Sequence, residues 1–83
     1  MVNVMINAYI LISLETGNSK EVIKEMRTIE HIEKISIVAG DYDIVVRVLV
    51  ETLEELLQVT DKIHLIKGVK KTTTQVIEKE LTL

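Results

Sequence analysis

The densest polar group in the sequence is Asp41-Tyr42-Asp43, which directly follows Gly40. Carboxylates accept hydrogen bonds from an ammonium group, whereas hydroxyls and free backbone amides donate to a carboxylate. Together with threonines 72–74 near the end of the chain, this turn could hold a small zwitterion. A structural reading stays open, because Gly-Asp suits a turn, Asp43 could satisfy nearby amides, and threonine favours strands.

Residues suited to catalysis or metal binding are few. His31 and His64 are the only histidines, each is expected at a helix end, and we interpret both as surface residues. There is no cysteine, and the three glycines are too far apart to form a phosphate-binding loop. We therefore predict no catalytic residue, no metal site and no cofactor.

Composition limits the class of protein. Eighty-three residues, 47% hydrophobic and 28% charged, suit one globular domain. The net charge is −3 and the basic residues are scattered, which argues against direct binding of nucleic acid. The apolar opening stretch is shorter than the ~20 residues that span a bilayer, so we expect a soluble, cytoplasmic protein with no membrane partner.

Hydrophobic periodicity predicts six elements. Apolar residues recur with period two from Val4 to Leu14, which indicates a strand. Asn18 and Glu21 have capping-box spacing before a helix over residues 19–30, and Thr52 and Glu55 repeat that spacing before a second helix that stops at Gly68. The other predicted strands span residues 32–39, 42–51 and 69–83. The expected apolar stripe of the second helix is Leu53, Leu56, Leu57, Thr60 and Ile63.

This order, βαββαβ, predicts an α+β ferredoxin-like plait. The break at Gly40-Asp41 joins two apolar strands as a hairpin. Right-handed crossovers then put both helices on one side of a four-stranded antiparallel sheet. The wholly apolar strand faces should lie under the helices.

The opposite sheet face is also partly apolar. A bare apolar face is rare on a soluble monomer, and burying such side chains at ~1.5–3 kcal/mol each would drive association. We therefore predict a two-fold homodimer packed sheet to sheet as an α/β barrel. Its interface would contain Met5, Tyr9, Leu11, Val45, Arg47 and Leu49.

Two loose motifs, in this element order, resemble the ligand-binding domain of the Lrp/AsnC transcriptional regulators, also called RAM. The first is V-x-G-x-Y-D, formed by Val38, Gly40, Tyr42 and Asp43. The second is I-x-G-V-x-x-T-x-T, formed by Ile66, Gly68, Val69, Thr72 and Thr74. The resemblance covers the chain from Val4 to about Glu80.

The resemblance implies a plait that dimerises through its sheets; four such dimers often assemble into an octamer in this family, which leaves the dimer and the octamer as alternatives here. It also implies an amino-acid effector at the contact between dimers. Carried over by position, the ligand-binding residues would be Gly40, Asp41, Tyr42, Asp43, Thr72 and Thr74.

Because the first predicted strand begins within a few residues of Met1, we expect no counterpart of the family's helix-turn-helix DNA-binding domain. The resemblance therefore implies a single RAM-type domain over residues 1–83 that modulates transcription regulation alone or with a full-length regulator. Two alternatives remain. One is a small dimeric α/β-barrel enzyme, like a monooxygenase or decarboxylase, with Tyr9 and Arg47 on the relevant face and a cavity under the sheet. The other is a purely structural oligomeriser.

Overall fold

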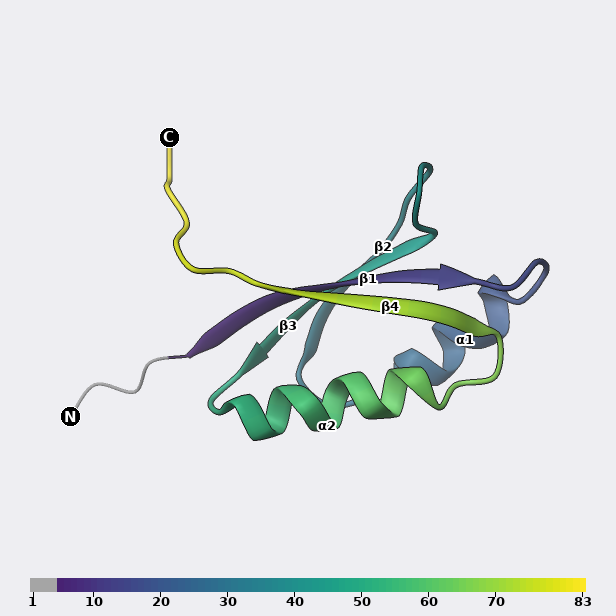
Figure 1. Cartoon of the computed structure of the whole chain (residues 1–83), viewed down its shortest axis with the longest axis horizontal. Helices are drawn as coiled ribbons and strands as arrows, with labels where there is room; N and C mark the ends of the chain where they lie inside the picture. Colours follow the sequence, from purple (N-terminus) through teal and green to yellow (C-terminus); the bar gives the residue numbers. More distant parts are fainter. Residues whose placement is uncertain (1–4) are drawn as a thin grey trace.

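The computed structural model describes residues 5–83, and its four-stranded antiparallel sheet carries both helices on one side (Figure 1). The elements are β1 (Ile6–Leu14), α1 (Ser19–Met26), β2 (Ile32–Ile37), β3 (Ile44–Val50), α2 (Leu53–His64) and β4 (Val69–Val76). Strand order in the sheet is β2-β3-β1-β4. This confirms the α+β ferredoxin-like plait. Val4, the predicted start of the first strand, lies outside the described residues.

Period-two alternation in β1 and β3 produces the core. The side chains of Ala8, Ile10 and Ile12 are fully buried, as are the four alternate residues of β3 from Ile44 to Val50. The helices cover them with Val22, Met26, Leu56, Val59 and Ile63. Within residues 5–83 no polar side chain is buried in this core, and no helix is long and apolar enough to cross a membrane.

Only one of the two predicted capping boxes forms. The Oγ1 atom of Thr52 accepts from the Glu55 amide at 3.1 Å, and the Glu55 carboxylate accepts from the Thr52 amide at 3.2 Å. The prediction for Asn18 is wrong, because its side chain caps no amide of α1. Its Nδ2 atom instead donates to the carbonyls of Glu15 and Thr16, in the turn that precedes the helix.

Several elements end earlier than the sequence predicts. α1 stops at Met26 rather than near residue 30, because the following residues form a tight turn in which Thr28 Oγ1 donates to the Glu25 carbonyl at 2.7 Å. β2 and α2 end at Ile37 and His64, before the predicted residue 39 and Gly68. β4 ends at Val76, since β1, its pairing partner, begins at Ile6.

The predicted apolar stripe of α2 is wrong in two positions. The side chains of Leu53 and Leu57 are 62% and 63% exposed. The helix buries Leu56 and Ile63, as predicted, together with Val59, which the prediction omitted; these three recur at three- and four-residue intervals. Both sets have helical spacing, so periodicity alone left open which of them faces the sheet.

Candidate functional site

The loop between β2 and β3, residues 38–43, is attached to β1 by hydrogen bonds at its C-terminal end. The Asp43 amide donates to the Ile12 carbonyl at 2.9 Å, and the Leu14 amide donates to Asp43 Oδ2 at 2.7 Å. Across the loop, the Val38 amide donates to the Asp43 carbonyl at 2.9 Å. Gly40 has a φ of 147°, which favours glycine. Asp43 therefore has the structural role of satisfying a backbone amide.

Tyr42 connects the loop to β4. Its hydroxyl lies 3.3 Å from Thr73 Oγ1, so the two hydroxyls share a hydrogen bond. The structure thus brings Thr73 to the predicted loop. The argument from residue types included Thr73 among threonines 72–74, whereas the ligand-binding residues carried over from the family resemblance omitted it.

Thr72 and Thr74 belong to the other face of the sheet. They pair with Ile12 and Ile10, whose side chains are buried under the helices, and directly opposed residues project to the same face. Thr73 pairs with Leu11 on the open face. The alternation of side chains along β4 would have placed these threonines on their faces if the register of β4 with β1 had been known.

A hollow of about 390 Å³ lies beside the loop. The turn between β1 and α1 forms one wall through Glu15, Thr16 and Gly17, and the start of the loop forms another through Val38. Of the predicted ligand-binding residues, only Asp43 lines it. The hollow offers backbone groups, a hydroxyl and carboxylates next to apolar side chains, a combination suited to a small polar molecule.

The residues predicted for the dimer interface share the open face of the sheet. Tyr9 pairs with Arg47, Leu11 with Val45, and Asn7 with Leu49 across β1 and β3. These positions alternate with the buried core residues, so their side chains point away from the helices. Met5 lies just before β1 and is exposed.

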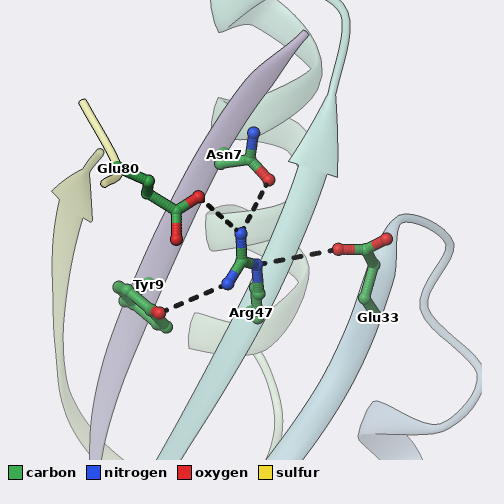
Figure 2. Close-up of polar contacts among 5 residues, drawn as sticks. All are labelled: Asn7, Tyr9, Glu33, Arg47 and Glu80. Atoms are coloured by element: carbon green, nitrogen blue, oxygen red, sulfur yellow. Dashed lines mark hydrogen bonds and ion pairs between the residues drawn. The ribbon is translucent and has the colours of Figure 1, made fainter. Parts of the chain in front are cut away.

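Arg47 is the centre of a polar network on this open face (Figure 2). Its Nη2 atom donates to Glu80 Oε1 at 2.7 Å and to Asn7 Oδ1 at 3.4 Å, and Nη1 donates to the Tyr9 hydroxyl at 3.4 Å. Nε lies 3.9 Å from Glu33 Oε1. The guanidinium carbon also lies 5.7 Å from the centroid of the Tyr9 ring, which favours a cation–π contact.

The network also stabilises the charge of Arg47. The hydrogen bond to Glu80 and the nearby negative charges raise the pKa of Arg47 above its ordinary value, although partial burial opposes them. An arginine is protonated across the physiological range in any surroundings, so Arg47 is a fixed cation on this face.

Both histidines are exposed, as predicted. His31 Nε2 lies 3.6 Å from Glu55 Oε2, and His31 has a φ of 77°, an uncommon angle outside glycine. In the part of the chain that the structure describes, no group of three His, Cys, Asp or Glu side chains could hold a metal ion.

Comparison with known proteins assigns the chain to a family. The profile of the Lrp/AsnC ligand binding domain matches residues 7–82. The chain belongs to the Lrp/AsnC family. This confirms the resemblance seen in the turn and in the Thr-rich ending.

The Lrp/AsnC relatives are regulators much longer than the match. The HTH-type transcriptional regulator FL11 of Pyrococcus abyssi is 36% identical over 72 residues, which are 87% of this chain and 48% of FL11. The chain thus spans about half the length of this relative. A homocitrate synthase of Sulfolobus acidocaldarius is 33% identical over 78 residues, covering 90% of this chain but 17% of the enzyme.

Solved structures share the fold of this chain. TTHA0845 from Thermus thermophilus has a TM-score of 0.86 and 25% identity, over 94% of this chain and 99% of that one. The feast or famine regulatory protein of M. tuberculosis, solved in complex with L-methionine, has a TM-score of 0.79 over 94% of this chain and 53% of that one. At 22% identity, this second likeness shows the fold alone.

Proposed function

We propose that the chain is an effector-sensing and oligomerisation module that acts in transcription regulation. The observation that carries this proposal is the match of the Lrp/AsnC ligand binding domain along residues 7–82. In this proposal the module binds an amino acid, associates with copies of itself, and transmits the effector signal to a full-length regulator of the same family.

The proposed ligand site combines the loop with the adjoining hollow. Its volume of about 390 Å³ falls in the ~300–1,000 Å³ range typical of small-molecule sites. The bond from the Leu14 amide fixes Asp43 at its wall, while Asp41 is exposed at the tip of the loop and offers a carboxylate to an ammonium group. Gly40, Tyr42, Thr72 and Thr74 stay predicted contributors. The matched family model, a ligand binding domain, supports the binding of a small molecule.

Calorimetric titration with the standard amino acids tests this site. We expect one or a few to bind, and Asp41→Ala to weaken binding about tenfold or more, since a hydrogen bond to a charged group contributes ~1.5–3 kcal/mol. Glu30→Ala is the matched control, because Glu30 is an exposed acid beyond the opposite end of β2. No heat with any amino acid would contradict the proposed ligand class.

We also propose homodimerisation through the open sheet face. Arg47 already has intramolecular partners, so burying it would leave no unpaired cation. Leu49→Glu would place a charge on this face without touching the core. Sedimentation velocity should then show a folded monomer for the variant and a dimer or a multiple of it for the wild type. A folded wild-type monomer at micromolar concentration would contradict the proposal.

A regulatory rather than catalytic role also accounts for the match to homocitrate synthase. The matched part is only 17% of that enzyme, which suits an appended effector domain. Within residues 5–83, the interior between sheet and helices is filled by apolar side chains, which supports a non-enzymatic role. Co-purification with a full-length Lrp/AsnC regulator, changed by the bound amino acid, would support the transcriptional role over that of a structural oligomeriser.

A further inference from the structure

Tyr42 is the one half-buried residue of the loop between β2 and β3, since residues 38–41 and Asp43 are exposed. Its hydroxyl meets Thr73 on β4. The loop leads into β3, however, and β1 lies between β3 and β4 in the sheet. The side chain of Tyr42 therefore reaches across β1.

Tyr42 crosses β1 on the open face of the sheet. Thr73 pairs with Leu11, whose side chain points away from the helices. The neighbours of Thr73 on this face of β4, Lys71 and Gln75, are exposed, whereas Thr73 is half-buried. This difference fits a Tyr42 side chain that covers Thr73.

The tip of the loop has few other attachments. At its base, the Val38 amide donates to the Asp43 carbonyl. Within residues 5–83, no other backbone group forms a hydrogen bond with the backbone of residues 39–42. The bond from Tyr42 to Thr73 therefore attaches the tip to the sheet. Its length of 3.3 Å exceeds the ~2.7–2.8 Å usual for two hydroxyls, so it restrains the tip without fixing it rigidly.

The restraint on Tyr42 extends to its neighbour Asp41. Asp41 is the proposed partner of the ligand's ammonium group and directly precedes Tyr42 in the chain. Holding Tyr42 therefore limits the positions that the Asp41 carboxylate can take. A site whose groups are in place before binding has the higher affinity, because less conformational freedom is lost when the ligand binds.

We propose that Thr73 is a positioning residue of the effector site, which acts by holding Tyr42 across β1 and so restrains the loop tip. The inference rests on the proposed function, because it concerns the amino-acid site formed by this loop. In this role Thr73 contacts Tyr42 and not the ligand. Threonines 72 and 74 project to the other face of the sheet, so they cannot take its place.

Tyr42→Phe and Thr73→Val test the attachment without any ligand. Each removes one hydroxyl and keeps the approximate size of the side chain, so both variants should fold, as checked by circular dichroism. NMR relaxation should show lower order parameters for the amides of residues 39–41 in both variants. The double variant should be no more mobile than either single variant, because both remove the same bond. Thr73→Ser keeps the hydroxyl and should restore the wild-type values.

Tyr9→Phe and Thr60→Val are the matched controls for mobility. Tyr9 also has its hydroxyl on the open face, but this hydroxyl bonds to Arg47 (Figure 2). Thr60 is half-buried like Thr73, but its hydroxyl donates to a carbonyl within α2. Neither substitution should change the order parameters of residues 39–41.

Calorimetric titration with the standard amino acids then measures the effect on the site. We expect Thr73→Val to weaken binding about two- to tenfold, the range that corresponds to the loss of one neutral hydrogen bond. Thr73→Ser and Thr60→Val should bind as the wild type does.

The outcomes separate this inference from the proposed function. An unchanged loop tip in Thr73→Val, or an unchanged affinity for the amino acid that binds the wild type, would overturn the inference and leave the proposed function standing. If no amino acid binds the wild type, the proposed ligand class falls, and the effector role of Thr73 falls with it.

Discussion

Asp43 and Asp41 differ in role although they stand two positions apart. Asp43 accepts a 2.7 Å hydrogen bond from the Leu14 amide, whereas Asp41 is exposed at the loop tip. The sequence predicted both alternatives, a ligand site and a turn that satisfies its own amides. For Asp43 the structural alternative describes the observed contact, and ligand binding stays a prediction.

We predict that Asp43→Ala lowers the free energy of unfolding by about 1 kcal/mol, the typical value for an exposed hydrogen bond lost from a backbone amide. Urea denaturation measures this change. Asp41→Ala should change stability by less than ~0.5 kcal/mol, as surface substitutions usually do. Equal losses in the two variants would contradict the assignment of Asp43 as the structural residue.

Thr73 shows what residue types alone could not reveal. The Thr-x-Thr ending pointed to Thr72 and Thr74, yet the Tyr42 hydroxyl meets Thr73. Which threonine faces Tyr42 depends on the register of β4 against β1, and a shift of one residue would reverse every side chain. The sequence shows that side chains of β4 alternate between the two sheet faces, but it does not show which threonine lies on which face.

At the scale of elements, α2 also shows that periodicity alone does not determine which face of an element is buried. Its start after Thr52 was predictable, because capping chemistry is local. Its buried face was predicted only in part, because Leu53 and Leu57 have the same periodicity as the core residues. The predicted cap of α1 failed for another reason: the Asn18 side chain turns back to the preceding carbonyls.

The capping difference yields a prediction. Thr52→Ala should lower the free energy of unfolding by about 1 kcal/mol, because it removes the acceptor of the Glu55 amide. Asn18→Ala should have a smaller effect on α1 capping, since its side chain accepts from no helix amide. Chemical denaturation of the two variants compares them, and a larger loss for Asn18→Ala would contradict the observed caps.

Gly68, in the connection between α2 and β4, packs directly on α1. It has a φ of 101°, and a Cβ atom there would lie 2.8 Å from Asn18 Cβ and 3.1 Å from Val22 Cγ2. We predict that Gly68→Ala destabilises the protein by roughly 2–4 kcal/mol, from left-handed strain and overpacking together.

Gly17→Ala is the control for that prediction. Gly17 also has a positive φ, 84°, but no neighbouring atom would contact the added Cβ within 4 Å. Gly17→Ala should therefore lower the free energy of unfolding only by the cost of left-handed backbone strain, about 1–2 kcal/mol. Thermal or urea unfolding measures this loss. If Gly17→Ala and Gly68→Ala lowered the free energy of unfolding equally, the contact of the added Cβ with Asn18 and Val22 would not contribute to the destabilisation.

At the scale of the whole molecule, within residues 5–83, neither helix covers one face of the sheet, and β2 and β4 are its edge strands. The sequence predicted the uncovered face from the alternation in β1 and β3, and the structure confirms its composition. A groove lined by residues of α1 and β2 was beyond sequence reasoning, because it depends on how α1 lies against β2.

If the chain associates through the open sheet face, we predict that its thermal stability depends on protein concentration. If only the assembled form is fully stable, the thermal midpoint of the wild type should rise with protein concentration, by mass action. The midpoint of Leu49→Glu should not. Differential scanning calorimetry over a wide concentration range measures both, and a wild-type midpoint independent of concentration would argue against a dissociating dimer.

The central claim, that this chain senses an amino acid at the loop between β2 and β3, is tested most directly by NMR titration of the labelled protein with each amino acid. The account predicts saturable shifts in the amide signals of residues 14–17 and 38–43. No shift with any amino acid, or shifts confined to other parts of the chain, would contradict it.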